Sequence, residues 1–288
     1  MSNFKGLSVL SLAFGLIMLT ACSQDNGVGP AEDLTVNEDV AESVASSLGE
    51  DNGGAVDAIG DLTDVAGETN FQILGKTSAT SGVQSVDASY DSVNGIWTIE
   101  LFRERGNPPG TFYSLIERVY TVQFLHNGVP QKFWKVVGDT ADTIHFNIID
   151  AAGRHKTRHL SQELKELTAS LVATGTNTNL ITINGTYRRA ATDTLTNRSV
   201  TRTLDHTIDL NFIDVTVPRG SRQDVSENIS GTITGTYHAD ITFDGPRGYS
   251  EKTVDREINI TLEDGEAAIN VAGRVFSCNL GLGELLGD

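Results

Sequence analysis

The chain of 288 residues has only two cysteines, Cys22 and Cys278, so at most one disulfide can form within it. This excludes the framework of disulfides that stabilises many small secreted domains. Positive charge is also scarce, with 21 Lys and Arg against 38 Asp and Glu and a formal net charge of −17. Nucleic acids and anionic headgroups are bound by basic surfaces, and we therefore expect no nucleic-acid partner.

Familiar catalytic motifs are absent as well. The sequence contains no G-x-S-x-G, P-loop, dinucleotide-binding or H-E-x-x-H pattern. His155, His159 and Glu163 have a spacing that would place three metal ligands on one face of a helix. Arg and Lys residues surround them, however, and favour a solvated basic face over a zinc site. We expect a protein that is not an enzyme, with no catalytic residue, metal or cofactor.

Acidic residues are concentrated near the N-terminus, where residues 23–75 carry twelve Asp or Glu and no Lys or Arg. Within this region, residues 35–68 show helical periodicity that is interrupted by the sequence GEDNGG. The apolar residues that repeat with this spacing are Val40, Val44, Leu48, Ile59, Leu62 and Val65. The pattern predicts an acidic helical segment of two short helices over 35–68, with the carboxylates on their outer faces.

Residues 69–288 change to a period of two and are rich in Thr, Ile, Val, Phe and Tyr, with Asn, Gly and Asp between the runs. This pattern predicts an antiparallel β domain of long strands joined in sequential order, including a hairpin turn at Asn127-Gly128. A sheet of this size usually curls. The predicted fold class is therefore mainly β, a meander curled into a barrel or half-barrel, with two short N-terminal helices.

A 50-residue internal repeat is visible within the β domain. Residues 182–214 align with 232–264 without gaps, with ten identities in 33 positions. Asp205 and Asp255 match in this alignment, as do Asp214 and Asp264, and we interpret them as shared fold positions rather than as an active site. The aligned apolar face is the candidate concave, ligand-binding face, and it consists of Ile183, Gly185, Tyr187, Ile233, Gly235 and Tyr237. Its glycines indicate tight curvature or close approach of another element.

The segment 160–174 has two readings. Its leucines follow helical spacing, at Leu160, Leu164, Leu167 and Leu171. Residues 169–187 also read as a hairpin with its turn at 176–179. We favour a short helix or irregular entry that passes into a strand from about Ala169.

The N-terminus has one basic residue, Lys5, followed by an apolar run that is too short to span a bilayer and ends in Leu19-Thr20-Ala21-Cys22. This ending resembles the lipobox of bacterial lipoproteins. The resemblance covers the first 22 residues only. It implies a signal peptide over 1–21, cleavage before Cys22 and attachment of lipid to Cys22, which would leave Cys278 without a partner for a disulfide. Residues 22–34 are then expected to form a flexible tether.

These observations predict a lipid-anchored protein of the bacterial cell envelope, at the outer membrane, held through lipid on Cys22. The leading hypothesis is a binding or carrier module that takes a hydrophobic ligand or an envelope protein on its concave apolar face. A structural or adhesive surface module is the alternative, and a hydrolase of envelope or extracellular polymers is the second alternative. Cys278 is expected to be a small, partly buried residue rather than a reactive thiol.

Overall fold

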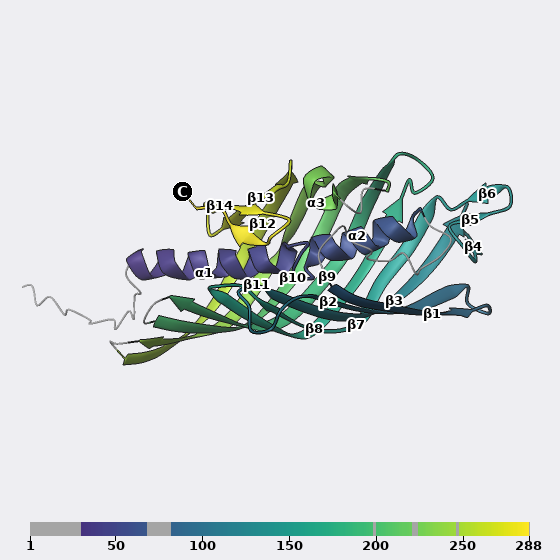
Figure 1. Cartoon of the computed structure of the whole chain (residues 1–288). Coiled ribbons are helices and arrows are strands. Elements are labelled where there is room, and N and C mark those ends of the chain that lie inside the picture. Colours follow the sequence, from purple (N-terminus) through teal and green to yellow (C-terminus); the bar gives the residue numbers. More distant parts are fainter. Residues whose placement is uncertain (1–29, 68–81, 198–199, 221–223, 246–247, 288) are drawn as a thin grey trace, which may run out of the picture.

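A computed structural model describes residues 30–67, 82–197, 200–220, 224–245 and 248–287. The predicted signal peptide and Cys22 lie outside the described residues. The chain is mainly β, and its principal feature is one large antiparallel sheet with strands in the order β1-β2-β3-β7-β8-β9-β10-β11-β12-β13-β14-β15, with β4 paired to β3 (Figure 1). The predicted mainly β meander is therefore confirmed. In the described part of the chain no pairing joins β1 to β15, and no closed barrel is found.

The strands of this sheet are β1 (Gly82–Asp91), β2 (Ile96–Gly106), β3 (Tyr113–His126), β4 (Val129–Gln131), β7 (Thr143–Lys156), β8 (Leu160–Thr174), β9 (Leu180–Asn197), β10 (Val200–Pro218), β11 (Ser230–Gly245), β12 (Gly248–Glu263), β13 (Glu266–Val271), β14 (Arg274–Asn279) and β15 (Glu284–Leu285). A separate ribbon pairs β5 (Lys135–Val136) with β6 (Asp139–Thr140). The helices are α1 (Pro30–Leu48), α2 (Ala55–Val65) and the one-turn α3 (Val225–Asn228).

Several turns and one bulge of the sheet need a backbone with positive φ, and Asn, Asp or Gly occupies these positions. Asn127 and Gly128 both have positive φ and join β3 to β4, as the sequence predicted. Asp214 and Asp264 each have φ of 49°. Asp264 lies in the β12–β13 turn, whereas Asp214 lies inside β10 at a bulge. The two aspartates thus share a left-handed backbone conformation, which Asp adopts more readily than most residues.

The segment from Leu160 forms strand β8 throughout, so the favoured reading of a helix or irregular entry was wrong. The hairpin reading is confirmed, because Thr174 pairs with Thr182 across the turn. A β-bulge between Leu164 and Glu166 explains the misleading pattern. The extra residue shifts the inward parity from even to odd positions, so the step from Leu164 to Leu167 imitates helical spacing. Between β4 and β5 the chain bends at residues 132–134.

Helices α1 and α2 follow each other along one face of the sheet, with β1 and β2 on one side and β13 and β14 on the other (Figure 1). Helix α1 begins at Pro30, five residues before the predicted boundary, because Pro suits the first turn of a helix. Leu48 and Gly54 flank the break between the two helices, where Gly53 takes φ of 73°. Both helices are buried over most of their circumference.

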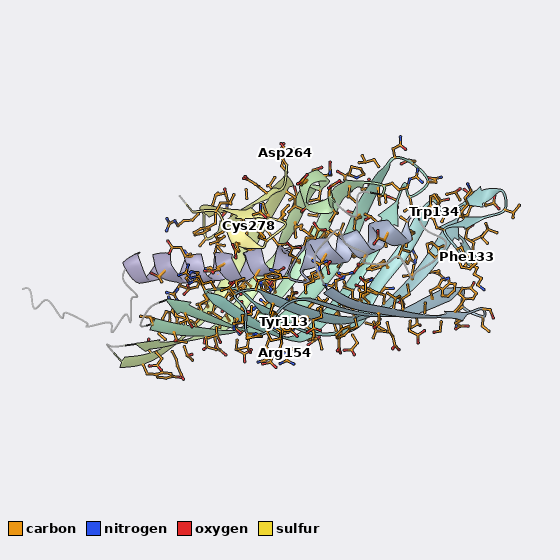
Figure 2. All side chains as sticks on the ribbon, viewed as in Figure 1. Tyr113, Phe133, Trp134, Arg154, Asp264 and Cys278 are labelled. Carbon is orange, nitrogen blue, oxygen red and sulfur yellow. The ribbon has the colours of Figure 1, made fainter. Side chains whose placement is uncertain are left out.

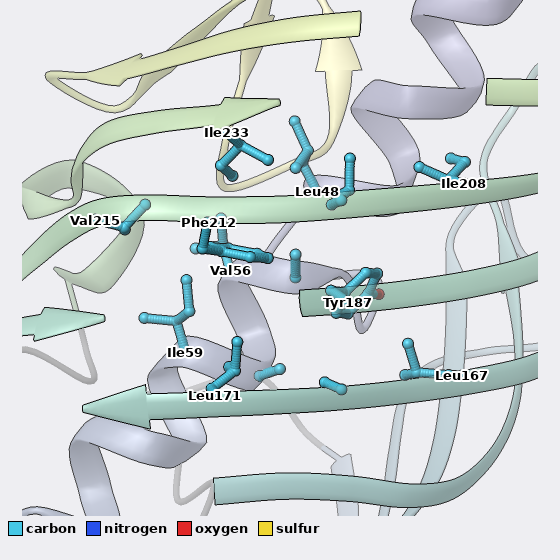
Figure 3. Packing of buried hydrophobic residues seen from close by; sticks show 14 of the residues in the cluster. Leu48, Val56, Ile59, Leu167, Leu171, Tyr187, Ile208, Phe212, Val215 and Ile233 are labelled. Atoms are coloured by element: carbon cyan, nitrogen blue, oxygen red, sulfur yellow. The ribbon is translucent and has the colours of Figure 1, made fainter. Parts of the chain in front are cut away.

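The core lies between these helices and the inner face of the sheet. Leu48 of α1 and Ile59 of α2 face Tyr187, Phe212 and neighbouring strand residues (Figure 3). Over most of β8 to β12, alternate residues point toward the helices and are buried, and their neighbours are partly or fully exposed. Burial of one face explains the strict period of two, because a slip by one residue would expose the apolar set.

Candidate functional site

The residues of the predicted ligand-binding face are brought together, but their apolar members are covered. Ile183, Tyr187, Ile233 and Tyr237 are each at most 1% exposed and belong to the core between sheet and helices. The sheet thus has the predicted apolar inner surface, and helices α1 and α2 lie against it. No free apolar surface is left at these positions.

The two glycines of this face mark close approaches between strands. A Cβ on Gly185 would lie 2.1 Å from the carbonyl oxygen of Ser170, and one on Gly235 would lie 2.1 Å from that of Asp209. Gly185 also has φ of 140°, whereas Gly235 does not have positive φ. These positions require glycine because the neighbouring strand backbone fills the space.

The acidic segment meets arginines of the sheet inside the protein. Arg103 donates to Asp57 at 2.6 and 2.7 Å and to Asp61 at 2.7 Å. Arg118 donates to Asp57 at 2.8 Å and to Asp61 at 3.3 Å. Tyr120 donates a further hydrogen bond to Asp61. We call these two carboxylates and two guanidinium groups the charge cluster.

The charge cluster corrects the expectation that the acidic side chains of the helices face outward. Asp57 and Asp61 are completely buried, since α2 lies with these residues against β2 and β3. Burial by itself would lower the pKa of Arg118, but Tyr120, Asp57 and Asp61 outweigh this and raise it. A charged guanidinium is therefore stabilised deep inside the molecule.

Arginines also hold the break between the helices. Arg118 donates to the carbonyl oxygens of Gly53 and Gly54 at 2.5 and 3.3 Å, and Arg189 donates to Gly53 at 3.2 Å. Arg189 donates to Gln162 as well. Two strands far apart in the sequence thus hold the same loop. Carbonyl groups at a helix break lack helical partners, and these donors satisfy them.

Further polar contacts continue along α1. Asp39 pairs with Arg202 at 2.9 Å, and Asn37 accepts from Arg256 at 2.9 Å. Burial raises the pKa of Asp39 to about 7, although the charge of Arg202 opposes the shift. The helix therefore lies against the sheet through ion pairs and hydrogen bonds as well as through apolar contacts.

One buried group contains the residue types of a catalytic triad, namely Ser43, Asp193 and His206. Their contacts do not follow the order of a triad. Ser43 donates to Asp193, and His206 Nε2 lies 3.2 Å from the same carboxylate. Burial would raise the pKa of Asp193, but the nearby His206 and the hydrogen bond from Ser43 outweigh burial and lower the pKa. The serine is bonded to the carboxylate rather than to the histidine, and all three side chains are buried. A catalytic serine needs a histidine or similar base and access to substrate, whereas Ser43 is bonded to a carboxylate of lowered pKa and is closed off from solvent.

His155, His159 and Glu163 do not share a face. His155 points inward, is 2% exposed and contacts the ring of Phe112 edge-on, whereas Glu163 points outward. The predicted solvated face was therefore wrong for His155, because β7 and β8 are strands whose alternate residues point to opposite sides. Burial and the charge of Arg189 lower the pKa of His155 to about 4. Within the described ranges, no group of three His, Cys, Asp or Glu side chains could hold a metal ion.

The spaces around the charge cluster and around His155 have no room for a water molecule. A groove of about 320 Å³ lies over β1, β2, β3 and β7. The outward residues that line it include Asp87, Glu100, Glu117 and Asp150. It is thus a solvent-facing acidic groove, separated by the sheet from the helices.

Cys278 is fully buried, and burial raises the pKa of its thiol to about 12. It lies in β14, where it pairs with Ala267 of β13, and Figure 2 labels it among the C-terminal strands. The thiolate that reacts with electrophiles is therefore disfavoured, in agreement with the interpretation of a packed residue.

The inward arginines were missed by the sequence reasoning, although the sequence contains their signal. Ile99, Leu101, Arg103 and Arg105 share one parity of β2, so the inward apolar series continues into arginines. An inward arginine must find a partner, and the acidic segment is the part of the chain that has carboxylates without nearby basic residues. Together these features could have predicted that the acidic helices enter the sheet.

Across the described ranges, no helix combines the length and apolar character needed to cross a membrane. Comparison of the chain with protein-family models, with curated proteins and with solved structures found no match.

Proposed function

We propose that this chain is a lipid-anchored module of the bacterial cell envelope, at the outer membrane, without enzymatic activity. In this proposal the sheet curls into a half-barrel that its own helices fill, and the protein works as a structural or adhesive support that offers its exposed surfaces to a partner. One observation favours this function over a carrier: α1 and α2 cover the concave face. Helix α2 is held there by the charge cluster, and α1 is held by the contacts of Asp39 with Arg202 and of Asn37 with Arg256. Unless the helices leave, a ligand has no access to that face.

The anchor rests on the lipobox-like sequence ending at Cys22. Only seven residues lie between Cys22 and Pro30, and the eight steps from one to the other reach at most about 29 Å in an extended chain. Lipid on Cys22 would therefore keep the start of α1 close to the membrane. The opposite end of the molecule, with β4, β5 and β6, would point away from it (Figure 1).

Labelling of cells with radioactive palmitate tests the anchor. We expect the full chain to incorporate label and Cys22→Ala to lose it. Cys278→Ala is the matched control, because it removes the other cysteine of the chain and should keep the label. Label that persists in Cys22→Ala, or that is lost in Cys278→Ala, would contradict lipidation at Cys22.

Hydrogen exchange tests whether the helices are a permanent part of the core. A structural module requires the amides of α1 and α2 to exchange as slowly as those of β9 to β11, that is, by global unfolding. If the amides of the helices exchange much faster than those of the strands, the helices open independently, and the proposed function as a structural module is wrong.

A carrier is the second candidate, and the polarity of the buried interface favours it. In the described part of the chain, both ring nitrogens of His155, Nε of Arg189 and the hydroxyl of Tyr237 have no hydrogen-bond partner. Interfaces that separate are more polar than permanent cores. Mass spectrometry of lipids that co-purify with the full chain distinguishes the two. A stoichiometric hydrophobic molecule, other than the lipid bonded to Cys22, would support the carrier.

A hydrolase has the least support. Its best candidate residues are Ser43, Asp193 and His206, which are buried and bonded in an order unsuited to nucleophilic attack.

A further inference from the structure

Three aromatic rings converge at the end of the sheet that lies farthest from the start of α1. Tyr90 of β1 and Trp97 of β2 are direct cross-strand partners, with ring centroids 4.9 Å apart. Phe133, from the bend between β4 and β5, stands 5.6 Å from Trp97. Figure 2 shows Phe133 beside this end of the molecule. All three rings are partly exposed.

The ammonium group of Lys132 lies over all three rings. Its Nζ is 5.1 Å from the centroid of Tyr90, 5.7 Å from that of Trp97 and 5.3 Å from that of Phe133. Cations within about 6 Å of an aromatic centroid are attracted by the negative face of the ring. The rings therefore form an aromatic cage, and the structure shows an ammonium group inside it.

Other cation–ring contacts of the described residues differ from this one. Arg219 lies over Trp134 alone, and Arg274 lies over Phe276 alone. Trp134 is buried and donates its indole N–H to Thr176, as a structural residue does. Convergence of three rings on one cation is the geometry that proteins use for quaternary and methylated ammonium ligands.

The backbone that carries the cage is fixed, whereas its occupant can leave. The indole N–H of Trp97 donates to the carbonyl oxygen of Lys132 at 2.5 Å. Gln131 donates to the carbonyls of Phe133 and Trp134 at 2.8 and 2.9 Å, which holds the bend. The side chain of Lys132 is exposed and has a flexible four-carbon stem. It can swing into solvent without disturbing the rings.

We propose that Tyr90, Trp97 and Phe133 form a binding site for a quaternary or methylated ammonium group, such as that of choline, and that Lys132 occupies the site until a ligand displaces it. A quaternary ammonium is less strongly hydrated than a lysine ammonium and covers more of the rings with its methyl groups. The net charge of −17 favours the approach of a cation. This site goes beyond the proposed function, because it depends neither on the lipid anchor nor on whether the helices move.

The test uses the full chain in a maltoside detergent, which carries no ammonium group, with choline chloride as the probe. The chain has two tryptophans, so a sample with ¹⁵N in its indole groups gives two signals, which Trp134→Phe assigns. We expect choline to shift the Trp97 signal in a saturable manner and to leave Trp134 nearly unchanged. The neutral isostere 3,3-dimethylbutan-1-ol should bind much more weakly, because it has the same shape without the charge.

Variants separate the cage from general hydrophobic contact. Phe133→Leu removes one ring and should weaken choline binding about two- to fivefold, the value of one exposed cation–ring contact. Lys132→Met removes the internal competitor and should tighten binding by a similar factor, whereas Lys135→Met, three residues away in the exposed ribbon, should have no effect. Thermal melting of each variant shows whether it is folded. Equal binding of the neutral isostere, no saturable shift of Trp97, or no tightening by Lys132→Met would each overturn the proposal.

Discussion

Asp57→Asn is the sharpest perturbation of the helix–sheet interface. The asparagine keeps the shape of the side chain and removes one of the two negative charges that face Arg103 and Arg118. In the wild type the two negative charges of the carboxylates in the charge cluster equal the two positive charges of its guanidinium groups. The variant leaves one positive charge in a place where the side chains are at most 4% exposed.

Removal of one partner from a buried ion pair costs roughly 3 to 5 kcal/mol, because the remaining charge stays in the interior without compensation. For a domain of this size, such a loss lowers the melting temperature on the order of 10 °C. Urea unfolding at pH 7.5, followed by tryptophan fluorescence, measures the change in the free energy of unfolding.

The matched control is Asp205→Asn, which breaks an ion pair at the surface. Asp205 and Lys165 are joined at 2.8 Å, like the pairs of the charge cluster, but their side chains are 60% and 48% exposed. Pairs in solvent contribute at most about 1 kcal/mol. The double variant Asp57→Asn/Arg103→Leu restores the balance of charge and should be about 1 to 3 kcal/mol more stable than the sum of the single changes. If Asp57→Asn costs no more than Asp205→Asn, the charge cluster does not hold the helices in the sheet.

Three further predictions concern single buried positions. His155 has its pKa lowered to about 4, so the unfolded chain binds its proton first, and stability should fall by about 3 kcal/mol as the pH drops from 6.5 to 4. His155→Leu should remove this loss in urea titrations across that range. Asp39→Asn should make the loss steeper, because the raised pKa of Asp39 stabilises the folded state as the pH falls from about 7. Parallel pH profiles of the variants and the wild type would contradict both assignments. Gly235→Ala places a Cβ against the carbonyl oxygen of Asp209 and should cost on the order of 2 to 3 kcal/mol in thermal or urea unfolding, while Gly67→Ala, with open space around it, should change little. Cys278 in the Cys22→Ser chain should react with Ellman's reagent at pH 8 only after unfolding in urea, and rapid reaction of the native protein would show that the thiol is accessible.

The arrangement of strands could be predicted from the sequence because local rules determine it. Alternation of apolar and polar residues and short turns such as Asn127-Gly128 specify antiparallel neighbours without knowledge of distant contacts. The error at Leu160–Leu171 has a different origin. A bulge is set by how two strands fit together, and the inserted residue changes the parity of the leucines without a local signal.

The filling of the inner face could be predicted only in part. The glycines at 185 and 235 indicated a close approach, and the structure identifies neighbouring strand backbone as the element that approaches. The ion pairs between the helices and the sheet could not be predicted, because each joins residues far apart in the sequence, such as Asp57 and Arg118. Neither segment alone indicates its partner. The aromatic cage was missed for the same reason, because Trp97 and Phe133 come together only when the bend after β4 folds over β2.

The position of α1 sets an order on folding. Asn37 meets Arg256 across 219 positions of sequence, and Ser43 meets Asp193 across 150. The helix therefore finds its partners only after most of the sheet has been synthesised and paired. Contacts between distant residues close large loops, and chains rich in them fold slowly. Until β12 and β13 are in place, α1 lacks partners that it needs, and the part of the inner face that α1 covers is open to association with other chains. We therefore expect this protein to rely on chaperones between its synthesis and its final packing more heavily than a helical protein of equal length would.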